Sequence, residues 1–136
     1  MKKDNKPYLI NFNKIGNADL GYITKAENSK LPFQIKRVYW TYFTPDDVIR
    51  GHHAHKQLEQ IIVASSGTIK LNIENTFGDK LEFVLDSPDK ALYIPCIHWR
   101  TIEFANNAVL LCLASEEYDE SDYIRDYNEF KKINNF

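Results

Sequence analysis

Short apolar segments separated by turn sequences recur along almost the whole chain, at a spacing of about ten residues. Aromatic and β-branched residues are frequent within them, as in segment 33–43, and these residue types favour β-strands. Turn sequences such as 44–47 (TPDD) and 65–67 (SSG) lie between them, because proline, aspartate, serine and glycine fit turn geometry. The pattern predicts an all-β sandwich or barrel. The predicted strands are 9–12, 20–24, 33–43, 51–55, 58–64, 68–74, 81–85, 91–94, 99–104 and 109–114.

The C-terminal region departs from this pattern. Between residues 119 and 130, Tyr123, Tyr127 and Phe130 have the spacing of one helix face. Asp119 or Ser121 is suited to cap such a helix. We therefore predict a short C-terminal helix here, packed against the barrel or against a partner subunit.

The length and charge of the chain limit its organisation and its partners. At 136 residues it is expected to form one domain, residues 1–136. The formal net charge of −2 provides no attraction to nucleic acid or an anionic membrane, so neither is expected as a partner. No apolar stretch approaches the roughly 18 residues of a membrane-spanning helix. No apolar segment follows the polar, lysine-rich start of the chain, which argues against a signal peptide.

The cysteines indicate the compartment. Cys96 and Cys112 both lie in apolar, strand-like segments. We expect two buried thiols in a reducing cytoplasm, although the sequence alone leaves a disulfide open.

The histidines are concentrated in one predicted strand, where three of the four occur at positions 52, 53 and 55. Side chains two residues apart share one face of a strand. His53 and His55 are therefore expected to point the same way and His52 the opposite way. Strand faces usually bury apolar side chains, so two titratable rings on one face indicate a functional site.

The order of His53, His55 and Glu59, followed by a strand and Gly67, resembles the first sequence motif of the cupin superfamily. The resemblance implies a double-stranded β-helix, or jelly-roll, barrel whose lumen receives the two histidines and the glutamate. In that superfamily a later histidine often joins them to bind a divalent metal, and His98 has a suitable position. Imidazole and carboxylate ligands suit iron, manganese, nickel or zinc.

Four segments carry a more specific signal: 35–39 (IKRVY), 50–60 (RGHHAHKQLEQ), 92–95 (LYIP) and 113–125 (LASEEYDESDYIR). Together they resemble the sugar-nucleotide 3,4-ketoisomerases, the WxcM-like cupins of deoxysugar biosynthesis, over residues 10–130. The resemblance implies a homodimer with exchanged strands and catalysis without a metal or other cofactor. It also implies the substrate, dTDP-4-keto-6-deoxy-D-glucose. The carbonyl would move from C4 to C3, and a separate enzyme would aminate the 3-keto product.

This chemistry suits the paired histidines. The C4 carbonyl acidifies the hydrogen on C3, a base removes it to leave an enediolate, and a proton returns to C4. Histidine has a reference pKa of about 6.5 and can both accept and donate a proton. We expect one of His53 and His55 to be the carbon base and the other to orient it or shuttle protons. The sequence does not assign the two roles.

Several residues are candidates for binding the substrate. An enediolate requires stabilised negative charge, and Arg37 and Tyr39, on one face of their strand, are expected to supply a charge and a hydrogen-bond donor. Arg50 is expected to contact ring oxygens or the diphosphate, and Lys56 is a second diphosphate candidate. Glu59 is expected to hold a histidine tautomer.

Two adjacent residues complete the candidate site. Trp99 is a candidate to stack on thymine, although a core position is the main alternative. Many relatives carry histidine at the next position, where this chain has Arg100. A permanently charged guanidinium cannot relay a proton, which restricts proton delivery to one face of C4. We therefore expect the gluco (quinovose-type) product rather than the galacto (fucose-type) product.

Three other functions remain open from the sequence. The first is a metal-dependent cupin enzyme using His53, His55, Glu59 and His98. The second is a cupin that binds a sugar nucleotide without catalysis. The third is a 3,5-epimerase acting on the same substrate, which would exchange hydrogens at C3 and C5 without moving the carbonyl.

Overall fold

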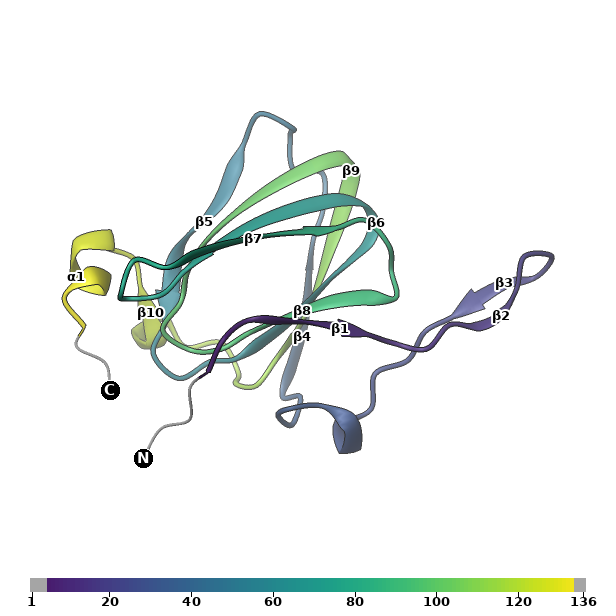
Figure 1. Ribbon diagram of the computed structural model, residues 1–136, viewed down its shortest axis with the longest axis horizontal. Coiled ribbons are helices and arrows are strands. Elements are labelled where there is room, and N and C mark those ends of the chain that lie inside the picture. Colours follow the sequence, from purple (N-terminus) through teal and green to yellow (C-terminus); the bar gives the residue numbers. More distant parts are fainter. Residues whose placement is uncertain (1–4, 134–136) are drawn as a thin grey trace.

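The computed structural model describes residues 5–133, which form an antiparallel β-barrel, a projecting hairpin and a short C-terminal helix (Figure 1). Two short 3-10 helices cover Asn28–Lys30 and Glu120–Asp122. No helix among residues 5–133 is long and apolar enough to cross a membrane. The other elements are β1 (Tyr8–Asn11), β2 (Ile15–Asn17), β3 (Gly21–Ile23), β4 (Arg37–Thr41), β5 (Ile49–His55), β6 (Gln60–Glu74), β7 (Lys80–Leu85), β8 (Lys90–Ile94), β9 (Trp99–Ala114), β10 (Tyr123–Ile124) and α1 (Tyr127–Lys131).

The two longest strands, β6 and β9, form the centre of the barrel and pair with each other along most of their length. The first part of β6 and the last part of β9 form a sheet with β8, β1 and β4. Their other halves form a sheet with β7, β5 and β10. Because both strands belong to both sheets, they wrap around the lumen. This confirms the predicted all-β cupin barrel.

A bulge allows each long strand to pass from one sheet to the other. The β6–β9 register shifts on either side of Ser66, and Gly67, Asn106 and Asn107 have φ values of 70°, 58° and 54°. A Cβ atom at Gly67 would lie 2.5 Å from the Cα atom of Ala108, so only glycine fits this approach. The predicted turn at 65–67 is therefore wrong: it is a bulge inside a continuous strand. Consequently two pairs of predicted strands are each one continuous strand: 58–64 with 68–74 in β6, and 99–104 with 109–114 in β9.

Alternate residues of β6 supply two separate apolar cores. Ile62 and Ala64 point into the lumen, whereas Ile61 and Val63 lie in a second cluster. The N-terminal segment covers that second cluster, so both faces of the strand are buried. Each fully buried isoleucine contributes about 1.5–3 kcal/mol to folding. The covering side chains are Ile10, Phe12, Leu31, Phe33 and Ile35.

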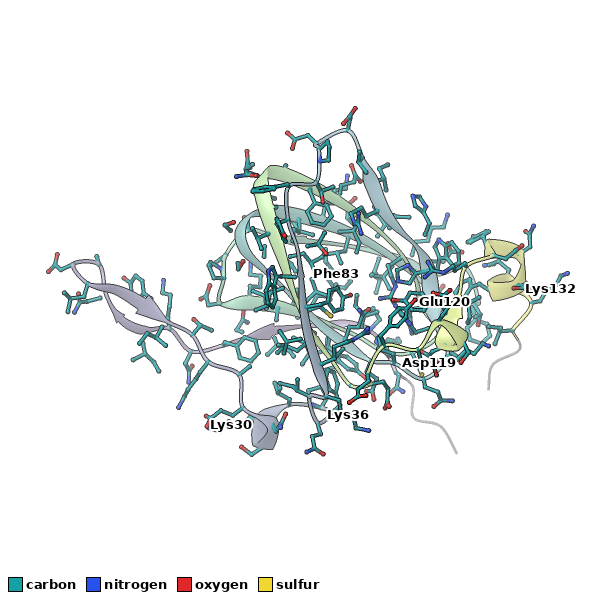
Figure 2. All side chains as sticks on the ribbon, turned by 180° about the vertical axis from the view of Figure 1, so that it is seen from behind. Lys30, Lys36, Phe83, Asp119, Glu120 and Lys132 are labelled. Carbon is teal, nitrogen blue, oxygen red and sulfur yellow. The ribbon has the colours of Figure 1, made fainter. Side chains whose placement is uncertain are left out.

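The β2–β3 hairpin projects away from the barrel and carries its side chains clear of it (Figures 1 and 2). Leu20 at its tip is 88% exposed and Ile23 is 66% exposed. Apolar side chains this exposed on a projecting element are typical of a surface that contacts another molecule.

The C-terminal helix is present but shorter than predicted. Only Tyr127–Lys131 is helical, and its cap is Asp126, which accepts hydrogen bonds from the backbone N–H groups of Asn128 and Glu129. Asp119 instead caps the preceding 3-10 turn by accepting from the Ser121 N–H. The first half of the predicted helix is wrong because strand pairing with β5 takes up the backbone of β10. Cys112 is buried, as expected, whereas Cys96 is only half-buried, and neither forms a disulfide within residues 5–133.

Candidate active site

His53 and His55 point the same way from the end of β5, as predicted, and their rings meet edge to face with centroids 4.8 Å apart. The Nδ1 atom of His53 lies 3.0 Å from the carbonyl oxygen of Gly51. A carbonyl only accepts, so Nδ1 carries the proton and the lone pair of Nε2 is free. His52 is exposed and bonds to the Ile49 carbonyl oxygen.

A bulge in β5 determines the direction of the His53 side chain. Gly51 pairs with Thr101 and His53 pairs with Arg100, so His52 is an extra residue that the opposing strand does not match. Gly51 has a φ of 93°, and a Cβ atom there would lie 2.8 Å from the backbone oxygen of Arg100. Since residues directly opposite on paired strands share a face, the bulge places His53 beside Arg100.

Both histidines are uncharged at neutral pH. Burial, followed by the charge of Arg100, lowers the pKa of His53 to about 3 and that of His55 to about 2. His55 is only 1% exposed. Neutral imidazoles can accept a proton, which is the state a general base requires.

Asp122 lies beside His55, with one carboxylate oxygen 3.3 Å from Nδ1. The contact is electrostatic, because neither ring nitrogen of His55 has an aligned hydrogen bond among residues 5–133. The same carboxylate accepts hydrogen bonds from the backbone N–H groups of Gln57 and Leu58 at 2.8 and 3.2 Å. Asp122 therefore ties the C-terminal segment to the end of β5 and favours a proton on Nδ1 of His55.

Arg100 is a buried cation, 1% exposed, that forms no ion pair with a carboxylate of residues 5–133. Its guanidinium donates to the Gln60 side-chain oxygen and, at 3.1 Å, to the His98 carbonyl oxygen. Its Nε atom has no partner within the part of the chain that the structure describes. Burial lowers the pKa of Arg100 to about 10, so it stays protonated at neutral pH. An anion beside it would supply the missing negative charge.

Arg37 and Tyr39 share the lumen-facing side of β4, as predicted. The Arg37 guanidinium lies 5.2 Å from the Tyr39 ring centroid. The Tyr39 hydroxyl accepts a hydrogen bond of 2.8 Å from the amide of Gln60, and burial raises the pKa of Tyr39 far above its ordinary value. Tyr39 is therefore a neutral phenol that can donate its proton in a hydrogen bond.

Tyr123 forms a wall of the site that the sequence did not reveal. Its ring centroid lies 4.4 Å from that of His55 and 5.1 Å from that of His53. The Arg125 guanidinium covers the ring at 4.1 Å and forms an ion pair with Glu120. Tyr123 was assigned to a helix face, although its strand pairing places it opposite His55. Gln60 and Asp122 were also missed, because polar residues at strand ends carry no distinctive spacing.

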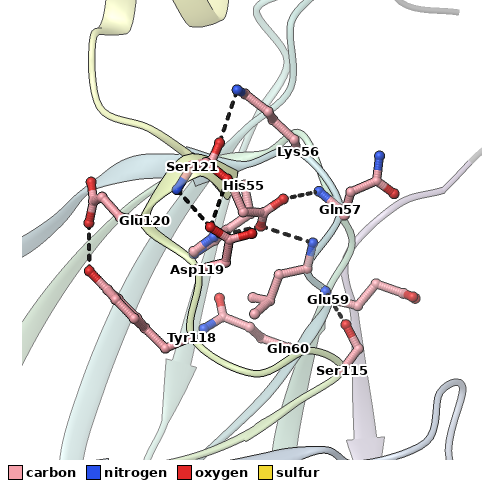
Figure 3. A network of polar contacts seen from close by, with 12 residues as sticks. His55, Lys56, Gln57, Glu59, Gln60, Ser115, Tyr118, Asp119, Glu120 and Ser121 are labelled. Carbon is pink, nitrogen blue, oxygen red and sulfur yellow. Dashed lines mark hydrogen bonds and ion pairs between the residues drawn. The ribbon is translucent and has the colours of Figure 1, made fainter.

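Four predicted site residues do not contact the two histidine rings: Arg50, Lys56, Glu59 and Trp99. Glu59 accepts a hydrogen bond from the Tyr93 hydroxyl, so its expected role beside a histidine falls to Asp122. Lys56 is exposed and bonds to the Ser121 carbonyl oxygen at 3.0 Å (Figure 3).

Trp99 packs against the C-terminal helix, with its ring 5.2 Å from Tyr127 and 5.7 Å from Phe130. It occupies the core position named as the alternative to thymine stacking. Arg50 is exposed, and its backbone lies opposite Ile102 in the β5–β9 pairing. It is therefore on the face of β5 that is directed to the lumen, nearer the start of the strand than the histidines.

The four ligands of the metal-dependent alternative are not assembled. No three His, Cys, Asp or Glu side chains among residues 5–133 are grouped so that they could hold a metal ion. The carboxylate of Glu59 is engaged by Tyr93, and the Nδ1 atom of His98 bonds to the Cys96 carbonyl oxygen at 2.9 Å. The donor set of this barrel therefore does not fit that alternative.

A cavity of about 540 Å³ leads from His55 toward solvent, a size typical of small-ligand sites. Its lining combines Lys36, Arg37 and the aromatic rings of Tyr118 and Tyr123 with four carboxylates, those of Glu116, Glu117, Asp119 and Asp122. Lys36 forms an ion pair of 3.6 Å with Glu116. The rings suit a planar group of a ligand, and within this lining Arg37 is the cation that is not paired with Glu116 and could meet a negative group.

Known proteins resemble the chain along nearly its whole length. A family model described as FdtA: WxcM-like, C-terminal, matches residues 5–135. The TDP-4-oxo-6-deoxy-alpha-D-glucose-3,4-oxoisomerase of Aneurinibacillus thermoaerophilus is 40% identical over 91% of this chain and 89% of its own.

Solved structures agree with this resemblance. A mutant of the 3,4-ketoisomerase QdtA from Thermoanaerobacterium thermosaccharolyticum, in complex with TDP-4-keto-6-deoxyglucose, superposes with a TM-score of 0.87 at 36% identity, covering 92% of this chain and 91% of that one. The TDP-quinovose 3,4-ketoisomerase WlaRB from Campylobacter jejuni gives a TM-score of 0.87 at 37% identity, covering 93% and 98% of the two chains.

Proposed function

This chain belongs to the FdtA family of WxcM-like C-terminal domains, and we propose that it is a dTDP-4-keto-6-deoxy-D-glucose 3,4-ketoisomerase. It is an isomerase that moves the carbonyl of the sugar from C4 to C3. One observation carries the proposal: two uncharged histidines, His55 buried and His53 half-buried, adjoin a buried arginine that has no carboxylate partner among residues 5–133. That arrangement provides a base for a carbon-bound proton and a positive charge for the resulting anion.

The first step breaks the C3–H bond. The Nε2 atom of His53 or of His55 takes the proton, and the bonding electrons form a C3=C4 double bond while the C4 oxygen becomes negative. The guanidinium of Arg100 and the hydroxyl of Tyr39 supply the charge and the hydrogen bond that stabilise this oxygen. A preorganised donor of this kind typically contributes 10²–10³ in kcat.

The second step restores a carbonyl at the other carbon. The C3 hydroxyl proton moves to the C4 oxygen, the protonated histidine delivers a proton to C4, and the electrons of the C3=C4 double bond and of the C3 oxygen rearrange to form the C3 carbonyl. No atom is gained or lost overall. The two histidines lie 4.8 Å apart, so one can act on the carbon while its neighbour moves a proton between the oxygens.

The nucleotide part of the substrate would occupy the 540 Å³ cavity. Arg37 places positive charge there for the diphosphate, Lys36 would contribute only by leaving its ion pair with Glu116, and Tyr118 offers a ring for the base. Arg50 and Lys56, both exposed, remain candidates for contacts with the outer parts of the ligand.

Arg100 supports the gluco outcome for the product. A guanidinium that stays charged cannot give a proton to C4, so delivery comes only from the side on which the histidines lie. The C4 hydroxyl would then take the quinovose-type configuration.

A homodimer with exchanged strands is the assembly that this surface supports. The β2–β3 hairpin exposes Leu20 and Ile23. Trp40 on the outer face of β4 is 60% exposed, and Tyr42, just after the end of β4, is 55% exposed. A second copy would cover these apolar groups. A cytoplasmic location is consistent with two cysteines that form no disulfide within residues 5–133.

The decisive experiment is incubation of the purified protein with dTDP-4-keto-6-deoxyglucose in deuterated water, followed by NMR of the product. The expected product has the carbonyl at C3 and deuterium at C4. His53→Asn and His55→Asn variants should be tested in parallel. The variant without the carbon base loses hydrogen exchange at C3, whereas the other retains part of it.

Other results would identify the alternatives. Exchange at both C3 and C5 with the carbonyl still at C4 would indicate a 3,5-epimerase. Binding without exchange would indicate a non-catalytic cupin. Full activity in both histidine variants would refute the proposed mechanism.

A further inference from the structure

The side-chain amide of Gln60 joins two groups that the proposed mechanism uses. Gln60 is the first residue of β6 and is only 2% exposed. Its oxygen accepts from the guanidinium of Arg100. Its nitrogen donates to the Tyr39 hydroxyl at 2.8 Å and to the Cys112 sulfur at 3.3 Å. The amide therefore connects β9 to β4 across the lumen.

The orientation of this amide follows from its partners. A guanidinium has only donors, so the Gln60 oxygen must face Arg100. The NH2 group then necessarily faces Tyr39, and the phenol oxygen acts as acceptor. An amide turned by 180° would place NH2 against a buried cation, which would leave Arg100 without its side-chain acceptor at a cost of several kcal/mol.

This orientation determines what the Tyr39 proton can do. A phenol has one proton, and Gln60 does not take it because the amide nitrogen is itself a donor. Cys112 is the other polar neighbour, and its sulfur shares a side-chain hydrogen bond with the Tyr39 hydroxyl. Burial raises the pKa of its thiol to about 11, so the thiol is neutral. A neutral thiol is a weak acceptor. The Tyr39 proton therefore stays available for a stronger acceptor in the lumen.

We propose that Gln60 is a positioning residue that reserves the Tyr39 hydroxyl as a hydrogen-bond donor to the enediolate oxygen, with its own orientation set by Arg100. The role rests on the proposed ketoisomerase function and deepens it. Arg100 then acts on the anion in two ways, by its own charge and through the Gln60–Tyr39 hydrogen bond.

The Gln60→Glu variant reverses the polarity of this contact with little change in shape. A carboxylate still accepts from Arg100, but it also accepts the Tyr39 proton. The donor to the substrate is lost, so kcat should fall by about 10²–10³ while KM changes little. Gln34→Glu is the matched control, because Gln34 is exposed and should keep parental kinetics.

A double-mutant cycle with Tyr39→Phe separates positioning from packing. If Gln60 acts through Tyr39, adding Gln60→Glu to Tyr39→Phe should lower kcat by no more than about threefold beyond the single variant. The proposal would be overturned if the kcat of the double variant fell by the product of the two single-variant decreases. It would also be overturned if Gln60→Glu kept the parental kcat.

Raman spectroscopy tests the hydrogen bond without relying on turnover. The intensity ratio of the tyrosine ring doublet distinguishes a phenol that accepts from one that donates, and the Tyr39 contribution is the difference between parent and Tyr39→Phe. It should show an acceptor in the parent and a donor in Gln60→Glu. A donor signature in the parent overturns the inference even if Gln60→Glu does not fold. A parent with the acceptor signature but no ketoisomerase activity refutes the proposed function alone.

Discussion

A carboxylate oxygen of Asp122 lies 3.3 Å from Nδ1 of His55, although the two residues belong to distant parts of the chain. Pairing of β10 with β5 creates this contact, because Tyr123 lies opposite His55 and carries Asp122 with it. The carboxylate is only 14% exposed, so water weakens its effect on the ring little. The negative charge favours the His55 tautomer that leaves Nε2 free for proton transfer.

Asp122→Asn should lower kcat by about 10-fold to 100-fold with a small change in KM. The amide removes the charge that favours a proton on Nδ1, and loss of a carboxylate that orients a functional histidine typically has an effect of this size. Nitrogen-15 NMR of the histidine rings should show a mixed tautomer for His55. Asp126→Asn is the control: asparagine caps a helix about as well as aspartate, so the variant should leave both α1 and the His55 tautomer unchanged. An unaltered tautomer in Asp122→Asn would contradict the assignment.

Arg100→His should change the stereochemistry of the product. The substitution replaces a cation that cannot relay protons by a titratable ring in the same place, which opens the second face of C4. NMR of the product should show the gluco configuration for the parent and a share of the galacto configuration for the variant. Identical configurations would remove Arg100 from the stereochemical argument.

Stability should fall as the pH drops from about 6.5 to 5.5. His53 and His55 have pKa values of about 3 and 2 in the folded protein, so the unfolded chain binds more protons over this range and acid favours it. Each histidine contributes at most about 1.4 kcal/mol per pH unit. Urea unfolding at both pH values measures the slope, and it should be smaller in His55→Asn. An equal slope in parent and variant would contradict the lowered pKa.

Gly51→Ala should reduce both stability and kcat. The φ of 93° is unfavourable for alanine, and the new Cβ would meet the Arg100 backbone oxygen at 2.8 Å. The positive φ alone costs about 1–2 kcal/mol. Gly78→Ala is a matched control, since it has a φ of 92° and its nearest neighbour would be the Lys131 Nζ at 3.7 Å. Loss of kcat only at Gly51 would show that the bulge aligns His53 with Arg100; equal kcat in the two variants would argue against it.

The protein should be a dimer in size-exclusion chromatography with light scattering. Aspartate at both Leu20 and Ile23 should convert it to a monomer, because two charges would have to be buried in the contact. Phe77→Asp places a charge on an apolar side chain that is 77% exposed but lies at the β6–β7 turn, and it should remain dimeric. A monomeric parent would refute strand exchange.

Local sequence patterns were sufficient where a property depends on one strand. Side-chain alternation predicted that His53 and His55 share a face and that Arg37 and Tyr39 do so as well, because both pairs lie within single strands. Local sequence patterns gave the wrong structure where the long strand β6 bends. Residues 65–67 have the composition of a turn, but backbone pairing on both sides continues the strand through them.

Apolar periodicity was ambiguous in the C-terminal region. The aromatic spacing of 119–130 suits a helix. Two long-range interactions stabilise a strand instead: Tyr123 pairs with His55, and Asp122 accepts hydrogen bonds from two backbone N–H groups. Neither partner is visible from the segment itself, so the sequence could not identify it.

The sequence by itself determined the barrel class, the histidine pair and the charged position next to Trp99, because these depend on residue type and alternation along a strand. Only the tertiary structure decided which side chains meet in the lumen. Asp122 rather than Glu59 adjoins His55, Gln60 links Arg100 to Tyr39, and Trp99 belongs to the C-terminal cluster. Such contacts depend on strand register and on bulges, where a shift of one residue turns every side chain to the other face.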